Sequence, residues 1–364
     1  MTYKVKEYFT EYIWPGLGLF AESYLLFSVG TLRPIWEILY PDCFNFEICS
    51  HSLIHSLTYN VVLGIILGMI TIGIAANSIG RRAGSITTAS FMTGGAIGLV
   101  AGALFLKDKP EILFQSMSWC LFIFGIGVGG EYPLSASSAS EKSMCEMKIR
   151  LDSNADFQPP MDGDLTAQTD VHATNRGKKV ILVFSMQGVG IFFNTLTVTF
   201  LLLVFGQLEG NMNYDEYYAK DDDNGAAYDM TILILIWQSI YVIGALFLVY
   251  ILFSRIKYLE ESQMWKEDKE KREAKQVDLH RIGEFLPPSA EDSTRASPRA
   301  LDRETHNVQS AARLLLNNYG SRLFGTSMSW LLWDIAFYGH KLFQSAFLLV
   351  ITGDNATLFE LCGG

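Results

Sequence analysis

Apolar residues in this chain gather in seven long blocks separated by shorter polar segments. Each block holds roughly 20 residues or more, which is the length a helix needs to cross the hydrocarbon core of a bilayer. The blocks cover about residues 12–32, 56–76, 85–106, 112–139, 179–205, 230–254 and 323–351. This pattern predicts an all-α, multi-pass integral membrane protein with six spans, a long polar connection and a seventh span.

The spacing of the blocks predicts three regions. Residues 1–255 form an N-terminal six-helix transmembrane bundle, 256–321 form a central connection, and 322–364 contain the seventh span and the start of a second bundle. The first block follows a short polar N-terminus and has no small-residue cleavage site close behind it. It is therefore interpreted as a membrane anchor rather than a removed signal peptide.

The polar segments differ in character. Residues 143–178 are predicted to be a cytoplasmic loop. Within the central connection, residues 260–285 have mixed charges at helical spacing and predict a solvated helix. Residues 287–304 are rich in Ser, Pro and charge, a composition typical of disorder.

Placement of the charges predicts the orientation of the chain. The net charge is −10, yet 23 of the 28 Lys and Arg residues fall on the N-terminal side of the membrane when the spans alternate. The positive-inside rule makes that side cytoplasmic, and we expect the plasma membrane as the location. Expected partners are the bilayer and small solutes rather than nucleic acid. Cys43 and Cys49 share the first outward loop, where a disulfide and two free thiols are both open possibilities.

The fourth block carries the most informative run, GIGVGGEYPLSASSASE from Gly125 to Glu141. A carboxylate at Glu131 and a phenol at Tyr132 lie inside an otherwise apolar span. A charge at that depth costs at least a few kcal/mol and usually marks an ion or substrate path. The glycines of this run are small enough to let helices pack closely.

Other spans also carry polar groups. Glu22 lies mid-span in the first block and Gln187 lies in the fifth; each is either a site residue or a hydrogen-bonded group within the helix bundle. In the seventh block Trp330, Asp334 and Tyr338 recur four apart and therefore share one helix face. An indole N–H, a carboxyl and a phenol on one stripe suit a tetrahedral oxyanion.

These runs closely resemble motifs of the proton-coupled inorganic phosphate symporters of the major facilitator superfamily. The resemblance covers the first, fourth, fifth and seventh blocks and the connection between the second and third, where Arg81 and Arg82 form part of a gating loop. Three positions depart from the family pattern. Leu25 replaces a second acid of the first span, Glu131 stands where Asp is usual, and Leu121 is near the place of a superfamily Arg.

The resemblance implies a function and a set of site residues. It implies proton-coupled uptake of phosphate by alternating access between two six-helix halves. The implied phosphate contacts are Tyr132, Gln187, Trp330, Asp334 and Tyr338, and the implied proton carriers are Glu22, Glu131 and Asp334. A carboxyl in such a site repels phosphate when ionised and donates a hydrogen bond when protonated, which links proton and phosphate binding.

Two other interpretations stay open from the sequence. The chain could be another carrier of the superfamily, for sugars or organic ions, or a non-transporting fragment or phosphate sensor, because five spans of the family pattern are not present before Gly364. An enzyme is not expected. The sequence shows no zinc-ligand cluster, nucleophile–base arrangement or nucleotide phosphate loop, and we expect no cofactor and no metal.

Overall fold

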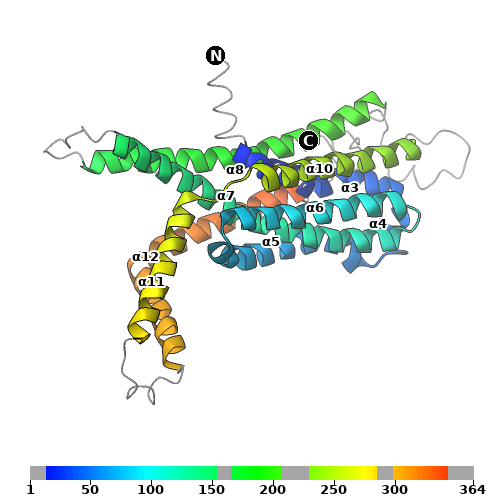
Figure 1. The fold of residues 1–364 in the computed structure, drawn as a ribbon. Helices are drawn as coiled ribbons and strands as arrows, with labels where there is room; N and C mark the ends of the chain where they lie inside the picture. The colour runs from blue at the N-terminus through cyan, green and yellow to red at the C-terminus, as the bar shows by residue number, and fades with distance from the viewer. Residues whose placement is uncertain (1–13, 154–164, 206–228, 285–297, 343–364) are drawn as a thin grey trace, which may run out of the picture. The chain divides into compact units, whose positions relative to one another are not determined.

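The computed structural model describes residues 14–153, 165–205, 229–284 and 298–342, and every regular element in them is an α-helix (Figure 1). The all-α class is therefore confirmed. The elements are α2 (Trp14–Leu26), α3 (Ser28–Leu39), α4 (Pro41–Phe44), α5 (His51–Ile79), α6 (Arg81–Phe105), α7 (Pro110–Ser153), α8 (Leu165–Val204), α10 (Met230–Tyr258), α11 (Gln263–Glu284) and α12 (Pro298–Leu342).

Five of these helices contain stretches long and apolar enough to cross a membrane. The stretches are His51–Ala76, Arg81–Phe105, Pro110–Cys145, Val180–Val204 and Met230–Tyr258. They correspond to the second to sixth blocks of the sequence. Together with the apolar pattern, they support an integral multi-pass membrane protein.

The first block is divided between α2 and α3, which meet at Phe27. The Ser28 hydroxyl donates to the Leu25 carbonyl at 2.6 Å, and the Thr31 hydroxyl donates to the Phe27 carbonyl at 3.0 Å. Side-chain donors of this kind compete with the backbone ladder of a helix. The two helices follow one another with a single residue between them.

Two polar segments contain more helix than the sequence predicted. The segment 143–178 was expected to be a loop, but α7 continues to Ser153 and α8 begins at Leu165. Residues 298–304 were expected to be disordered, but they form the first turns of α12. Pro298 stands at the first helical position, where the missing N–H costs nothing, and good helix formers follow it.

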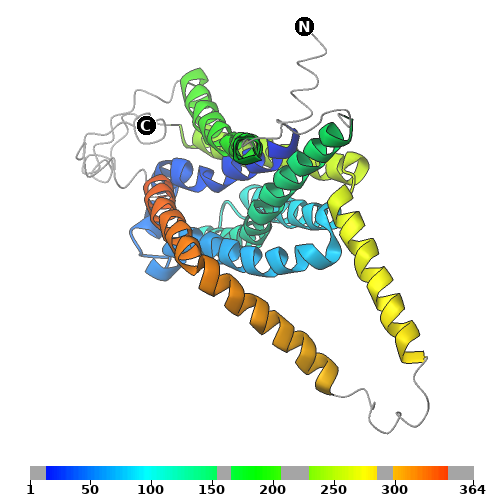
Figure 2. The ribbon, with the colours of Figure 1, turned by 90° about the vertical axis from the view of Figure 1, so that its left-hand side faces the viewer.

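The chain divides into two compact units, which are described separately. The first comprises Met1–Trp265 with Leu342–Gly364, and the second comprises Lys266–Lys341. In the first unit α7 packs against both α5 and α6, and α2 packs against α8 and α10. Figures 1 and 2 show α5, α6 and α7 side by side.

Glycines set the contact between α5 and α7, as the sequence predicted for the fourth block. A β-carbon placed on Gly125 or Gly129 would collide with the backbone of α5 around Val61 and Ile65. One placed on Gly64 or Gly68 would collide with the backbone of α7. Two glycine pairs spaced four apart therefore face each other, which lets the helix axes approach closely.

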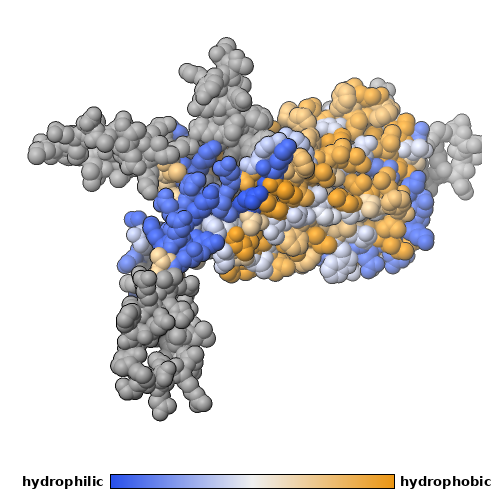
Figure 3. All heavy atoms as spheres, viewed as in Figure 1, coloured by the Kyte–Doolittle hydropathy of each residue, from blue (hydrophilic) through white to orange (hydrophobic). Residues whose placement is uncertain are grey.

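The outer surface of the bundle is apolar over most of its length. Large side chains of α5 and α6 are exposed, among them Ile66, Ile70, Ile74, Phe91 and Ile97. Figure 3 shows this apolar surface as a broad band over α5 and α6. Such a band is far larger than monomeric soluble proteins expose, and it suits contact with lipid.

Candidate functional site

A buried ion pair joins α7 to α10. Glu131 is 2% exposed, and both of its carboxylate oxygens accept from Arg255: Oε1 from Nη2, and Oε2 from Nη1 at 2.8 Å. The Thr88 hydroxyl of α6 also donates to Oε2 at 2.8 Å. A two-pronged pairing of this kind is the strongest arrangement that a guanidinium and a carboxylate can make.

Arg255 is held from a second side as well. Its Nη1 donates to the Ser85 carbonyl at 2.9 Å, and its side chain is 12% exposed. The pair therefore ties together α6, α7 and α10. Removing either charge would leave the other buried without its partner, which is strongly destabilising.

Glu22 of α2 lies beside this pair and is fully buried. Glu131, Arg255 and the Tyr132 hydroxyl all act on it electrostatically. Neither of its carboxyl oxygens has a hydrogen-bond partner of normal geometry in the described part of the chain. Two carboxyls thus share one guanidinium, and the cluster is electrically neutral only when one proton is bound to it.

Gly18 of α2 is what allows this arrangement. A β-carbon at Gly18 would collide with the Arg255 guanidinium and the Glu131 carboxylate. Gly18 precedes Glu22 by one helical turn, so both lie on the same face of α2. The missing side chain at Gly18 therefore makes room for the ion pair directly beside Glu22.

Tyr132 and Gln187 form the neighbouring polar pair. The Gln187 amide Nε2 of α8 donates to the Tyr132 hydroxyl of α7 at 3.0 Å. The Tyr132 ring stacks on Phe184, with ring centroids 6.1 Å apart. Both polar side chains are only partly buried. The structure thus brings together four residues that the sequence singled out: Glu22, Glu131, Tyr132 and Gln187.

The predicted gating loop is tied down by carboxylates. Arg81 donates through Nε and Nη2 to Glu141 Oε1, at 3.0 and 2.8 Å. The backbone N–H groups of Arg81 and Arg82 donate to the Glu261 carboxylate, at 2.7 Å and 3.1 Å to Oε1. Acidic side chains therefore hold this loop on two sides.

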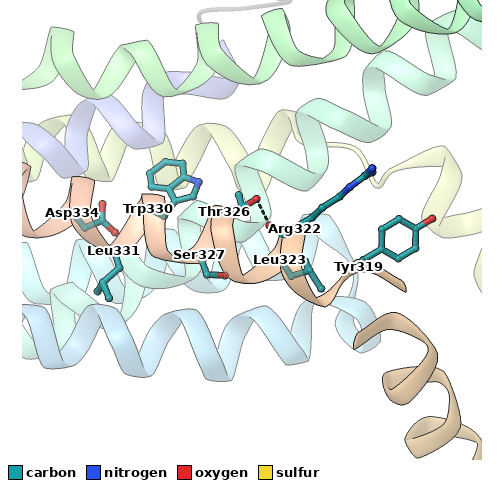
Figure 4. A pocket seen from close by; sticks show the side chains of 8 residues that line it. All are labelled: Tyr319, Arg322, Leu323, Thr326, Ser327, Trp330, Leu331 and Asp334. Atoms are coloured by element: carbon teal, nitrogen blue, oxygen red, sulfur yellow. Dashed lines mark hydrogen bonds between the residues drawn. The ribbon is translucent and has the colours of Figure 1, made fainter. Parts of the chain in front are cut away.

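The three remaining predicted residues lie on α12, in the second unit. Trp330 is 55% exposed, while Asp334 and Tyr338 are half-buried. Trp330 and Asp334 line a pocket along one side of α12, together with Tyr319, Arg322, Leu323, Thr326, Ser327 and Leu331. Figure 4 shows these side chains along the helix, with the Thr326 hydroxyl bonded to the Arg322 carbonyl at 2.8 Å.

Comparison with known proteins points to one group of membrane transporters. No family model matches the chain. Over about nine-tenths of its length it is similar to "Probable inorganic phosphate transporter 1-6" of Arabidopsis thaliana, with 24% identity over 333 residues, 90% of this chain and 56% of that protein.

Two further relatives agree. "Low affinity inorganic phosphate transporter 8" of Medicago truncatula is 24% identical over 90% of this chain and 52% of its own length. "Inorganic phosphate transporter 1-11" of Oryza sativa subsp. japonica is 23% identical over 90% of this chain and 53% of its own length. The chain is homologous to proteins named inorganic phosphate transporters.

This homology agrees with the resemblance found in the sequence motifs and with the all-α fold. The relatives are named transporters, not enzymes. The chain spans about half the length of these phosphate transporters. Their activity is therefore carried to it below as a proposal.

Arg255 is the residue that the sequence reasoning missed. It comes directly after the sixth apolar block and was counted among the cytoplasmic positive charges. In the structure α10 continues to Tyr258, so Arg255 is still part of the helix. A usable signal was present: an ionised acid inside a span needs a cation, and Leu121 is near the place where the resemblance implies an Arg.

Proposed function

We propose that the chain is part of a proton-coupled inorganic phosphate transporter. Support for the substrate comes from the names of the homologues and from the oxyanion-binding character of Tyr132, Gln187, Trp330, Asp334 and Tyr338. Support for the coupling comes from one observation, the shared buried charge of Glu22, Glu131 and Arg255.

Glu22 is the proton carrier in this proposal. Arg255 donates to both carboxylate oxygens of Glu131, whereas Glu22 has no hydrogen-bonded cation of its own. A buried carboxyl without a dedicated cation is more stable when neutral. One proton on Glu22 therefore balances the cluster, and its loss leaves a net negative charge inside the bundle.

Phosphate binding and proton binding then assist each other. The Tyr132 hydroxyl interacts with the Glu22 carboxyl and accepts from the Gln187 amide, so it connects the proton-carrying group to the proposed phosphate contacts. With Glu22 neutral, the negative charge that would repel phosphate is absent. By linkage, bound phosphate favours the protonated form to the same extent.

Glu131 and Asp334 have subsidiary roles in this proposal. Glu131 is the second proposed proton carrier, and we assign it to the release step, in which its pairing with Arg255 would open. Asp334 on α12 would donate to phosphate when protonated, beside the Trp330 indole and the Tyr338 phenol. Arg81 and Arg82, which bind Glu141 and Glu261, would hold the cytoplasmic gate closed.

Labelled phosphate uptake tests the substrate assignment. It is measured at acid and neutral external pH in cells that lack their own phosphate carriers, with this chain and with the longest product of its gene. Acid-stimulated phosphate uptake by either form supports the proposal. A well-expressed longest product that takes up no phosphate refutes it.

A further inference from the structure

Two imidazoles meet at the end of α5 farthest from the Gly80 turn. His51 and His55 are one helical turn apart, and their Nε2 atoms are 3.2 Å apart. His51 is exposed and His55 is half-buried, so the pair lies at the surface of the helix. This pair has no part in the proposed transport site.

The two rings are held in place by a stack of aromatic neighbours. The Phe46 ring lies 4.7 Å from the His51 ring, the two imidazoles are 4.2 Å apart, and the Tyr59 ring lies 6.1 Å from His55, between centroids. The loop that carries Phe46 is closed by a disulfide between Cys43 and Cys49. The sequence left open whether these two cysteines form a disulfide or remain free thiols, and the structure shows the disulfide. The bond fixes the loop beside the first turn of α5.

The spacing of the two nitrogens suits a metal ion. Zinc binds imidazole nitrogen at about 2.0–2.1 Å in tetrahedral geometry, which places two ligand nitrogens about 3.3 Å apart. Histidines four apart on one helix face are a known pairing for such ions. A direct hydrogen bond would fit the same distance with one ring as donor, so a binding measurement has to distinguish the two.

We propose that His51 and His55 form a two-imidazole site for a borderline divalent transition-metal cation of the Zn²⁺ and Cu²⁺ class. In the described part of the chain no third His, Cys, Asp or Glu joins them in a cluster, so water or an exogenous ligand completes the coordination. Hard cations such as Mg²⁺ prefer oxygen ligands and are not expected here. Arg33 acts on His55 electrostatically but is paired with Glu37 at 2.8 Å, which offsets its repulsion of a cation.

Zinc titration of the purified full chain, without an affinity tag that contains histidine, tests this site. Competition with a metal indicator is expected to show one saturable Zn²⁺ equivalent that excess Mg²⁺ does not displace. His51→Gln and His55→Gln should each weaken it by about tenfold or more, since even changes behind a ligand cost that much. His280→Gln, on α11, is the matched control and should leave the affinity unchanged.

Thermal unfolding provides a second readout that does not depend on the indicator. A ligand that binds only the folded state raises the unfolding temperature. We expect Zn²⁺ to raise it in the parent chain and in His280→Gln but not in His51→Gln or His55→Gln, whose metal-free unfolding should match the parent. Wild-type zinc affinity in both site variants, or no saturable binding in the parent chain, would overturn the proposal. Neither result bears on phosphate transport.

Discussion

Arg255 is the cation that balances the buried carboxyl groups beside it in the bundle. It pairs with Glu131 through two hydrogen bonds and also acts on Glu22, so two acids depend on one cation. Bringing both charges of such a pair out of water is costly, and removing one partner costs most because the other charge is left buried alone.

Glu131 depends on Arg255 for a buried cation. Arg255→Gln should lower the free energy of unfolding by about 3–5 kcal/mol, because it leaves Glu131 buried without a cation. The double variant Arg255→Gln/Glu131→Gln should recover part of that loss. Thermal unfolding in detergent measures both, with the exposed Arg313→Gln of α12 as a control of like chemistry. The single variant Glu131→Gln completes the comparison. If the losses of unfolding free energy in the two single variants sum to the loss in the double variant, the two residues do not interact.

Gly18 of α2 leaves room for the buried ion pair. Gly18→Ala should displace the Arg255–Glu131 pair, because the added β-carbon falls on both side chains. We expect a loss of about 1–3 kcal/mol from this overpacking. Gly188→Ala on α8 is the control, since a β-carbon there meets nothing within 4 Å. Equal stability of the two variants would mean that α2 does not pack against the pair as described.

At the scale of the helices, close approach through small residues organises the bundle. A β-carbon on Gly95 of α6 would meet Phe124 Cβ at 2.7 Å and the Cys120 carbonyl at 2.8 Å on α7, whereas one on its neighbour Gly94 would meet nothing within 4 Å. Gly95→Ala should therefore destabilise the bundle by about 1–3 kcal/mol. Gly94→Ala should be neutral or slightly stabilising, since Ala favours helix. The unfolding temperatures compare the two, and a reversed order would contradict the α6–α7 contact.

The start of α6 offers a further test at the same scale. Glu261 accepts from the first two N–H groups of α6, where the helix dipole favours an anion. Glu261→Ala should remove bonds to a charged group worth about 1.5–3 kcal/mol and so speed amide exchange at Arg81 and Arg82 about tenfold or more. Glu260→Ala, at the exposed neighbour, should leave that exchange unchanged. Unaltered exchange in both variants would show that Glu261 does not cap the helix.

At the scale of the whole molecule, the sequence predicted five of its membrane spans better than the details of its charges. Apolar blocks mark the spans because the bilayer demands about 20 apolar residues in a row. The same rule placed the end of the sixth span at residue 254 and so put Arg255 outside it. A long cationic side chain at a helix end can lie against apolar surface, and block boundaries do not reveal whether it turns inward.

Part of the candidate site was predictable because polar residues stand out within apolar spans. Glu22, Glu131, Tyr132 and Gln187 were visible as polar groups within apolar runs, and the structure brings all four together in the first unit. Arg255, the partner of Glu131, is 124 residues further along the chain, and only packing joins the two. The stripe of Trp330, Asp334 and Tyr338 on α12 stays a prediction as part of the phosphate site.

The pH dependence of phosphate uptake in the Glu22→Gln variant tests the central claim most directly. Uptake is measured in cells without their own phosphate carriers, using the longest gene product that transports, with the isosteric change at Glu22 and an unchanged Glu131–Arg255 pair. If the proton on Glu22 drives coupling, acid stimulation should disappear in the variant while uptake at neutral pH persists or falls. Full acid stimulation in a well-expressed Glu22→Gln variant would contradict the account.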